Sequence, residues 1–254
     1  MSSESQSQRR AVILAGGKGT RLLPYTIVVP KPMLPIGEIP IIEIISRQLK
    51  YYGFDELTIS LGHLSGMIKL YLEGKSEADS LPHFDFYQED LPLGTSGPLK
   101  AISPQEEHFL AINGDILTTL NMRDMYEEHI LKNATLTIGV RLTQYQLPLG
   151  SIEVDGNSQV TGFKEKPMVT HLDNIGAYVY SRRALDFIEP DEKIDLNILV
   201  ERLLAAGEKV LAYRSDGPYF WIDIGTHADY EKANKEFEEI RKLMPFLETK
   251  ESNQ

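Results

Sequence analysis

Residues 11–21 read Ala-Val-Ile-Leu-Ala-Gly-Gly-Lys-Gly-Thr-Arg, and the interpretation of the whole chain starts from this stretch. The run 11–15 is short and apolar, which predicts a buried β-strand. The glycines that follow allow the backbone to take positive φ and to approach a ligand closely. Successive amide groups in such a loop form a concave anion site, and Lys18 and Arg21 add positive charge. The pattern therefore indicates a strand followed by a phosphate-binding loop.

Two better-known glycine loops do not match, and a plain tight turn is the competing interpretation. Gly19 stands where a Walker A loop has Ser or Thr after its lysine, and Leu22 stands where a dinucleotide fingerprint requires glycine. A further cation, Lys31, lies between Pro30 and Pro32, whose φ angles are fixed. This concentration of cations and glycines suits a polyphosphate.

The composition is that of a globular protein with an acidic balance. The chain has 254 residues, of which 42% are hydrophobic and 25% charged, and this length allows a substantial core. Lys and Arg number 26 against 37 Asp and Glu, which gives a formal net charge of −11. A nucleic-acid-binding protein usually has a basic surface, so no nucleic-acid partner is expected. Anionic substrates then need locally concentrated cations.

The chain shows no targeting or membrane segment. No apolar run approaches the roughly 20 residues that span a bilayer, and residues 1–10 lack the apolar core of a signal peptide. The absence of Cys leaves no disulfide, thiolate ligand or cysteine nucleophile. We expect a disordered leader over residues 1–10, a tail over 245–254, no membrane partner and a cytoplasmic location.

Strand-like and helix-like segments alternate in the first half of the chain. This alternation predicts βαβ units and a mainly parallel sheet, with ligands at the carboxyl ends of its strands. The predicted strands are 11–15, 56–60, 83–87, 108–112 and 135–140, and the predicted helices are 40–52, 64–72, 97–102 and 122–132.

The sequence pattern changes from Gly150. Closely spaced strand-like runs follow, with a hairpin signal at Asp155-Gly156, and helices then return. These strands are 151–154, 160–164, 174–180 and 209–213, and the helices are 183–188, 196–206 and a long charged one over 227–242. With no internal repeat and no clean linker, residues 11–244 form one α/β domain in this interpretation.

The motif Gly-Gly-x-Gly-Thr-Arg-Leu-x-Pro from Gly16, followed by Pro-Lys-Pro-Met-Leu-Pro from Pro30, closely resembles the opening of the sugar-1-phosphate nucleotidyltransferases, or sugar-nucleotide pyrophosphorylases. The resemblance continues to about Asn234. It implies a Rossmann-like three-layer αβα domain with a mixed, mainly parallel sheet. Residues 11–140 would form the nucleotide-binding part, and 141–244 a β-rich sugar-phosphate-binding lobe. Many members add a β-helix of hexapeptide repeats; this sequence has no such repeat, so none is expected.

The resemblance assigns the nucleotide site. Arg21 and Lys31 take catalytic roles, and the phosphates and base would contact Leu14, Ala15, Gly16, Gly17, Lys18, Gly19, Thr20, Arg21, Gln88, Gly94 and Thr95. The Gln88 amide has both donors and acceptors for the edge of a base, and Gly94 permits close backbone approach. Pro98 departs from the usual family pattern but occurs in mannose-1-phosphate guanylyltransferase-like relatives, which favours GTP. Gln88 suits uracil or thymine equally.

Two aspartates are the predicted Mg²⁺ ligands. Asp115 follows the apolar run 109–112 in Asn-Gly-Asp, where a common turn is the alternative. Asp223 lies among Trp221, Ile222 and Ile224, and an acid there is costly to bury unless it meets a cation. The family matches both to metal ligands, and Mg²⁺ needs only one or two protein carboxylates.

The sugar phosphate has its own predicted set. As a bare pattern, Glu165-Lys166-Pro167 is a charged strand end, with a surface edge as the alternative. By resemblance, Lys166 is the catalytic lysine at the sugar phosphate and Glu165 hydrogen-bonds sugar hydroxyls. Gly150, Asn174 and Gly176 line the sugar pocket in the same way.

These features predict a Mg²⁺-dependent nucleotidyltransferase that joins a nucleoside triphosphate to a sugar 1-phosphate and releases pyrophosphate. Guanylyl transfer to mannose or heptose 1-phosphate is the main interpretation; uridylyl or thymidylyl transfer to glucose 1-phosphate is the alternative. A noncatalytic regulatory homologue is the rival from another class, although the loop glycines, Arg21 and both aspartates are present. Glycosyltransferases would favour Asp-x-Asp, which this sequence lacks. The family is usually oligomeric, so a homo-oligomer is among the expectations.

Overall fold

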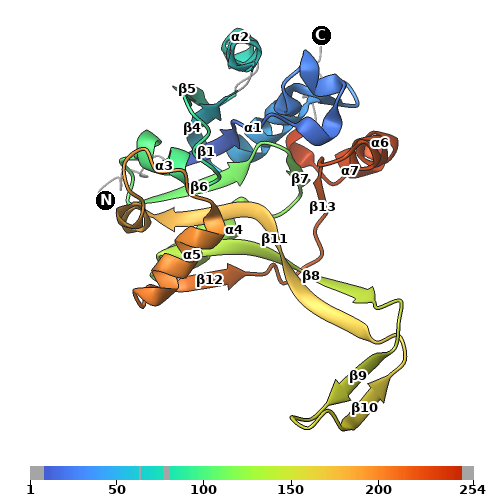
Figure 1. Cartoon of the computed structure of the whole chain (residues 1–254). Coiled ribbons are helices and arrows are strands. Elements are labelled where there is room, and N and C mark those ends of the chain that lie inside the picture. The colour runs from blue at the N-terminus through green and yellow to red at the C-terminus, as the bar shows by residue number, and fades with distance from the viewer. Residues whose placement is uncertain (1–8, 63, 77–80, 248–254) are drawn as a thin grey trace, which may run out of the picture.

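A seven-stranded sheet forms the centre of the molecule (Figure 1). The computed structural model describes residues 9–62, 64–76 and 81–247. The strand order is β12-β8-β11-β6-β1-β4-β5. The strands are β1 (Arg9–Ala15), β4 (Phe54–Leu61), β5 (His83–Gln88), β6 (His108–Asn113), β8 (Leu136–Gln146), β11 (Met168–Ser181) and β12 (Val210–Tyr213). Only β11 runs antiparallel to its neighbours β6 and β8, so the predicted mixed, mainly parallel sheet is confirmed.

Alternating side chains of β1 build the two cores that make the sheet the middle of three layers. Ala11, Ile13 and Ala15 pack with α1 (Ile41–Tyr51), α2 (Ser65–Ser76) and α4 (Met122–Leu131). Val12 points to the other face, where it packs with α3 (Gly97–Ile102) and α5 (Leu196–Ala205). Successive side chains of β1 thus point to opposite faces of the sheet, and both sets are buried, as expected for a strand that is covered on each side.

Smaller elements complete the fold around this sheet. The short strands pair as two-stranded sheets: β2 (Pro35–Ile36) with β3 (Ile39–Pro40), β7 (Ile116–Thr118) with β13 (Trp221–Asp223), and β9 (Ser151–Val154) with β10 (Val160–Lys164). The remaining helices are α6 (His227–Lys235), α7 (Phe237–Arg241) and the 3₁₀ turns η1 (Thr20–Leu22), η2 (Tyr25–Ile27), η3 (Lys31–Met33), η4 (Arg182–Phe187) and η5 (Pro245–Leu247).

The main departure from the predicted elements is the length of two strands. β8 runs on to Gln146 and β11 begins at Met168, well outside the predicted 135–140 and 174–180. Their outer halves leave the sheet as a two-stranded ribbon that ends in the β9–β10 hairpin (Figure 1). We call residues 141–173 the arm. No residue of the arm is buried, so it lacks the regular apolar alternation that reveals a strand in a sequence.

Four smaller features also differ from prediction. β1 begins at Arg9, so residues 9 and 10 belong to the sheet, and residues 1–8 of the predicted leader lie outside the described residues. The predicted tail begins with η5, whose Leu247 is buried, while residues 248–254 lie outside the described residues. The single helix expected over 227–242 is broken at Glu236, and Phe237 and Ile240 then pack into the core. The α-helix expected over 183–188 is instead the 3₁₀ turn η4 (Arg182–Phe187).

No helix in the described ranges is both long and apolar enough to cross a bilayer.

A contact between two histidines, His129 on α4 and the partly buried His108 at the start of β6, joins the helix to the sheet. His129 is fully buried, and its Nδ1 lies 2.8 Å from Thr137 Oγ1 while its Nε2 lies 3.2 Å from Nδ1 of His108. Burial, with His108 adding to it, lowers the pKa of His129 to about 3. Between pH 6.5 and about 3, therefore, the His129 imidazole is protonated in the unfolded chain but stays neutral in the folded protein.

The His129 environment predicts acid sensitivity with a defined window. The stabilisation is complete above the unfolded pKa of roughly 6.5 and is lost as pH falls towards the folded value, by up to about 1.4 kcal/mol per pH unit. Urea unfolding from pH 7.5 to 4.5 measures this slope. His129→Gln should lower stability at pH 7.5 but flatten the decline, whereas His83→Gln, at a histidine with 66% side-chain exposure, serves as the control. An equally steep decline in His129→Gln would contradict the assignment.

Candidate functional site

The glycine loop follows β1 and depends on glycine at one strained position. Gly19 has φ +62°, and a methyl group there would lie 2.8 Å from Cγ2 of Thr26. The Thr26 hydroxyl donates to the Gly19 carbonyl at 2.8 Å, which fixes the turn into η1. Gly17 is exposed, with no atom within 4 Å of the place of a Cβ. The loop is thus held in one shape while part of its backbone faces open space.

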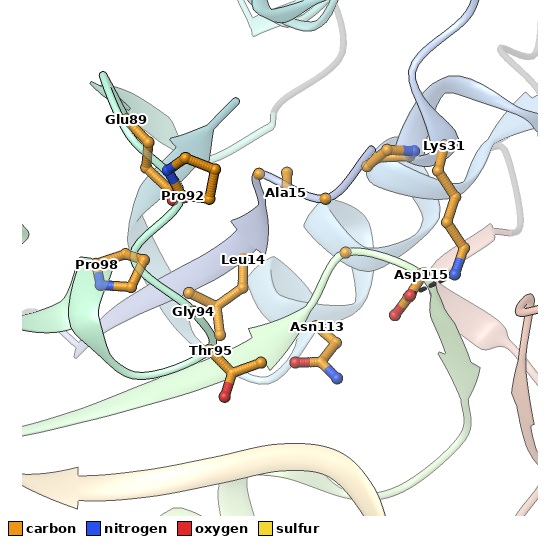
Figure 2. Close-up of a pocket in the computed structure, with 14 residues that line it drawn as sticks. Leu14, Ala15, Lys31, Glu89, Pro92, Gly94, Thr95, Pro98, Asn113 and Asp115 are labelled. Atoms are coloured by element: carbon orange, nitrogen blue, oxygen red, sulfur yellow. Dashed lines mark hydrogen bonds and ion pairs between the residues drawn. The ribbon is translucent and has the colours of Figure 1, made fainter. Parts of the chain in front are cut away.

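A cavity of about 290 Å³ lies beside this loop, at the carboxyl ends of β1 and β6. Figure 2 shows its lining, with Lys31 and Asp115 at one end and Glu89, Pro92 and Pro98 at the other. Open α/β sheets bind ligands at this edge. Of the predicted nucleotide-binding residues, the lining includes Leu14, Ala15, Gly16, Gly17, Gly94 and Thr95.

Two distant aspartates meet at the Lys31 end. Asp115 follows β6, and Asp223 ends β13, which pairs with β7 so that Asp223 lies opposite Ile116. The Ile224 amide donates to the Asp115 carbonyl at 2.9 Å and ties the two segments together. The carboxylates therefore become neighbours through a two-stranded pairing that neither local sequence reveals.

Lys31 lies between the two carboxylates. Its Nζ donates to Asp115 Oδ2 at 2.5 Å and lies 3.7 Å from Asp223 Oδ1. The lysine side chain is only 10% exposed, and η3 with its prolines sets its position. Arg21 completes the group: a methyl on Gly225 would lie 3.4 Å from its guanidinium and 3.1 Å from Asp223 Oδ2. Arg21, Lys31, Asp115 and Asp223 thus lie close together, whereas Lys166, the remaining catalytic residue expected there, lines neither the cavity nor the adjoining hollow.

The electrostatics of this group suit a divalent cation. Burial, and then the neighbouring Asp115 carboxylate, raise the pKa of Asp223 above its ordinary value, against the opposing effect of Lys31 and Arg21. Asp223 Oδ1 is buried and has no hydrogen-bond partner. Two adjacent carboxylates with an unsatisfied oxygen are the hard-oxygen donor set that Mg²⁺ takes, with water and phosphate completing its octahedron. Asp115 and Asp223 are therefore the residues that could hold the metal.

Another acidic cluster is a weaker metal candidate. Glu56, His83 and Asp85 each offer a ligand atom within 4.8 Å of the others. Arg10 already neutralises that cluster, because its guanidinium lies 2.8 Å from Asp85 and 3.9 Å from Glu56.

Asp223 also borders a second hollow, of about 290 Å³, outside the main cavity. Arg141 and Lys232 line this hollow together with Trp221, and the Arg141 guanidinium lies over the Trp221 ring at 4.2 Å. Asp115 lines the main cavity and Asp223 lines the second hollow, which also contains the cations Arg141 and Lys232 and the carboxylate of Asp229. Sequence reasoning missed Arg141 and Lys232, since each is an isolated basic residue.

At the opposite end of the cavity, the structure places Glu89 where the sequence suggested Gln88. Gln88 is exposed and does not line the cavity; its amide contacts the carbonyls of Gly62 and Glu89 at 3.4 and 3.3 Å. Glu89 does line it and accepts a hydrogen bond from Ser60 at 2.7 Å. A methyl on Gly16 would lie 2.4 Å from Glu89 Oε1, so the carboxylate packs directly on the glycine loop. Glu89 was adjacent to the predicted residue, but no motif marked it.

The Gly94-Thr95 turn is fixed from behind by the start of α5. Gly94 has φ +80°, and a Cβ there would meet the Ile194 carbonyl at 2.6 Å. Thr95 receives a hydrogen bond from the Leu196 amide at 2.9 Å, and its own amide donates to Asp195 at 3.0 Å. Both residues line the cavity on a turn that is tied to α5.

The predicted sugar-phosphate residues separate into two groups. Gly176 lies at the root of the arm beside the cavity, since a Cβ on it would meet the Asn113 amide at 2.8 Å, and its own amide donates to Asn174. Gly150, Glu165 and Lys166 lie far out on the arm, where a Cβ on Gly150 would be 3.2 Å from Glu165. Lys166 is exposed, has φ +43° and lines neither hollow described above.

The rest of the predicted phosphate loop lies beside the cavity without lining it. These residues are Lys18, Gly19, Thr20 and Arg21, of which Gly19 shapes the turn and Arg21 approaches Asp223. Asn113 and Gly114 line the cavity next to Asp115, although only Asp115 was predicted as a site residue.

Comparison with known proteins gives consistent results. A family model described as nucleotidyl transferase matches residues 10–240. The chain is 32% identical over 233 residues to the D-glycero-alpha-D-manno-heptose 1-phosphate guanylyltransferase of Aneurinibacillus thermoaerophilus, covering 90% of this chain and 98% of that one. It is 31% identical over 242 residues to the UTP–glucose-1-phosphate uridylyltransferase of Synechocystis sp., covering 88% of this chain but only 62% of that enzyme's length.

Solved structures agree with the sequence comparison. HddC from Yersinia pseudotuberculosis, in a crystal structure with GMP-PN, aligns with a TM-score of 0.69 at 26% identity and covers 91% of this chain and all of that one. From the glycine loop, the paired aspartates and these matches, we conclude that the chain belongs to the nucleotidyl transferase family.

Proposed function

We propose that this chain is a Mg²⁺-dependent sugar-1-phosphate nucleotidyltransferase, acting in the cytoplasm, with GTP as its nucleotide donor. The observation that carries the proposal is the meeting of Lys31, Asp115 and Asp223 at the end of a cavity whose wall is the Gly16-Gly17 backbone. Cations, carboxylates and free amides at one sheet edge are what a nucleotide triphosphate requires.

The reaction needs positioning more than acid–base chemistry. An oxygen of the sugar 1-phosphate attacks the α-phosphorus of the triphosphate, a new P–O bond forms, and the bond to the β-phosphate breaks to release pyrophosphate. The attacking oxygen is already anionic, so no protein nucleophile is needed. Mg²⁺ bound by Asp115 and Asp223 would neutralise phosphate charge at this point.

Each cation has a distinct place in this scheme. Lys31, at the end of the cavity beside the two carboxylates, would contact the α-phosphate. Arg21 would hold the leaving β- and γ-phosphates together with the glycine-loop amides. Arg141 and Lys232 line the adjoining hollow together with Asp223 and Asp229, and their side chains are the cations there that could contact the sugar phosphate. Losing one fixed charge of this kind typically costs about 10²–10³ in rate.

Glu89 favours guanine over uracil or thymine. An ionised carboxylate only accepts hydrogen bonds. The Watson–Crick edge of guanine has two adjacent donors, N1–H and the 2-amino group, whereas uracil and thymine have one donor between two carbonyls. The guanylyltransferase among the relatives, which this chain covers almost completely, supports the same choice and suggests a heptose or mannose 1-phosphate as acceptor.

The direct test is a substrate matrix. GTP, UTP, dTTP and ATP are each incubated with mannose, heptose and glucose 1-phosphates plus Mg²⁺, and pyrophosphate release is measured. We expect the fastest release with GTP. Release with UTP or dTTP and glucose 1-phosphate alone would replace the guanine assignment, and silence in every combination would favour a noncatalytic binder.

Glu89→Gln should change base preference. The amide presents a donor to guanine in place of one acceptor, and lost hydrogen bonds to a charged group are worth roughly 1.5–3 kcal/mol. We expect kcat/KM for GTP to fall about 10- to 100-fold while the much lower value for UTP stays constant. Glu107→Gln, at an exposed glutamate outside the cavity lining, is the control. Equal losses for both nucleotides would show that Glu89 supports the loop without reading the base.

Asp223→Asn separates metal binding from folding. Removing one of two repelling, partly buried carboxylates should raise Tm without Mg²⁺, because the Lys31–Asp115 pair remains. We expect Mg²⁺ to raise the Tm of the wild type in the presence of GTP, and the same variant should lose this rise together with about 10²–10³ of the rate. Thermal melts with and without Mg²⁺ measure both effects, with the exposed Asp186→Asn as control. A preserved Mg²⁺ shift in Asp223→Asn would remove Asp223 from the metal site.

A further inference from the structure

The segment that carries Arg21 and Lys31 has little regular structure of its own. We call residues 20–37 the cation segment. It consists of the 3₁₀ turns η1, η2 and η3 and the strand β2, and none of these elements is longer than three residues. Such a segment contains few of the internal hydrogen bonds that fix a helix or a sheet. Contacts from outside are therefore needed to set the position of the two cations.

His227, the first residue of α6, contacts the cation segment two residues after Arg21. Its Nε2 lies 2.7 Å from the Leu23 carbonyl oxygen. A carbonyl only accepts hydrogen bonds, so Nε2 carries the proton in this contact. The Tyr25 ring packs edge-on against the imidazole, with the ring centroids 5.2 Å apart. The contact thus restrains the turn that follows Arg21.

Two further residues of α6 hold the other end of the cation segment, beyond Lys31. The Tyr230 hydroxyl donates to the Pro35 carbonyl at 2.9 Å. The Asn234 side-chain oxygen accepts a hydrogen bond from the Gly37 amide, also at 2.9 Å. Lys31 therefore lies between two points of the chain that α6 holds.

The three contacts come from one side of the helix. Residues 227, 230 and 234 stand at i, i+3 and i+7, so they share one face of α6. All three are half-buried, and each forms its hydrogen bond with the backbone of the cation segment. We call His227, Tyr230 and Asn234 the α6 stripe. In Figure 1, α6 lies beside the blue ribbon that follows β1.

The same helix is tied to Asp223. α6 begins four residues after this carboxylate, and Thr226 fixes the start of the helix through a capping box. Gly225, within this connection, leaves room for Arg21, because a Cβ there would lie 3.4 Å from the guanidinium. The spacing between the cations and Asp223 thus depends on a single helix.

We propose that the α6 stripe positions the catalytic charges: from one helix face it sets where Arg21 and Lys31 lie relative to Asp223. Its members are positioning residues, since they touch the backbone that carries the cations. The inference rests on the proposed function for the roles of the two cations, and on the contacts of α6 for their placement. A misplacement of about 1 Å can cost on the order of 10² in rate, so the loss of one contact should be measurable.

His227 is the first residue to replace, because its contact lies nearest to Arg21 along the chain. His227→Leu removes the donor, so kcat for pyrophosphate release should fall about 10- to 100-fold while KM for GTP rises less than about tenfold. His227→Gln places an amide N–H near the position of Nε2 and should restore most of the lost rate. Lys235→Leu, at an exposed position of the same helix, is the control and should keep the wild-type kcat.

Thermal melts of the same proteins separate positioning from folding. A lower Tm with an unchanged kcat in His227→Leu would overturn the proposal, as would a His227→Gln enzyme that is no faster than His227→Leu. Tyr230→Phe keeps the ring and removes only the hydroxyl that holds Pro35. It should lower kcat by about three- to tenfold, the worth of one hydrogen bond, and an unchanged kcat would contradict the role of the α6 stripe.

A double-mutant cycle tests whether His227 acts through Arg21. Arg21→Lys keeps the charge but loses the guanidinium that the stripe would position. His227→Leu should then slow Arg21→Lys by no more than about threefold, much less than it slows the wild type. Losses that multiply in full would show that His227 acts independently of Arg21, against the proposal.

The two proposals fail in distinguishable ways. An active wild type whose kcat is unaffected by His227→Leu overturns the positioning role and leaves the proposed function intact. A wild type that is silent with every substrate pair overturns the proposed function. Calorimetric titration with GTP and Mg²⁺ then decides the role of the α6 stripe. Binding that His227→Leu weakens and His227→Gln restores supports it, and affinities that do not differ overturn it.

Discussion

The contact between Lys31 and the two aspartates is the constraint around which the site is built. A pair of adjacent carboxylates is unfavourable in a partly buried place, and the raised pKa of Asp223 reflects this strain. Lys31 offsets it from a position that η3 fixes, while β7–β13 pairing prevents the acids from moving apart. The protein thus holds two carboxylates side by side, with their charge offset by Lys31 and Arg21 and with Asp223 Oδ1 left without a hydrogen-bond partner.

Around this centre, packed strands and backbone hydrogen bonds fix the wall of the cavity. β1 and β6 are buried on both faces and place the glycine loop and Asp115 at one sheet edge. The Gly94-Thr95 turn is fixed by α5, and Glu89 packs against Gly16. The cavity wall is therefore a set of backbone segments that support one another.

The arm obeys a different physical rule. Its strands extend past the sheet because their pairing with each other continues after their pairing with β6 and β12 has ended. Apolar side chains exposed on both faces of a ribbon are unfavourable for a lone chain in water. The predicted sugar-phosphate residues Glu165 and Lys166 lie on this exposed ribbon, away from the residues that line the cavity.

The sequence alone determined the class of the fold and most of the central site. Strands buried on both faces give continuous apolar runs, and the loop of Gly16, Gly17 and Gly19 with Arg21 and Lys31 forms a local pattern that is legible without coordinates. Asp223 was also recognisable, because an acid among apolar neighbours requires a cation. The tertiary structure alone decided what depends on distant segments: the β7–β13 pairing that joins Asp223 to Asp115, the choice of Glu89 over Gln88, and the cations Arg141 and Lys232. It also decided the position of Lys166. That position depends on the long-range register of the strand pairing between residues 140–146 and 168–174, and an exposed ribbon of mixed polarity has no regular sequence pattern from which this register could be predicted.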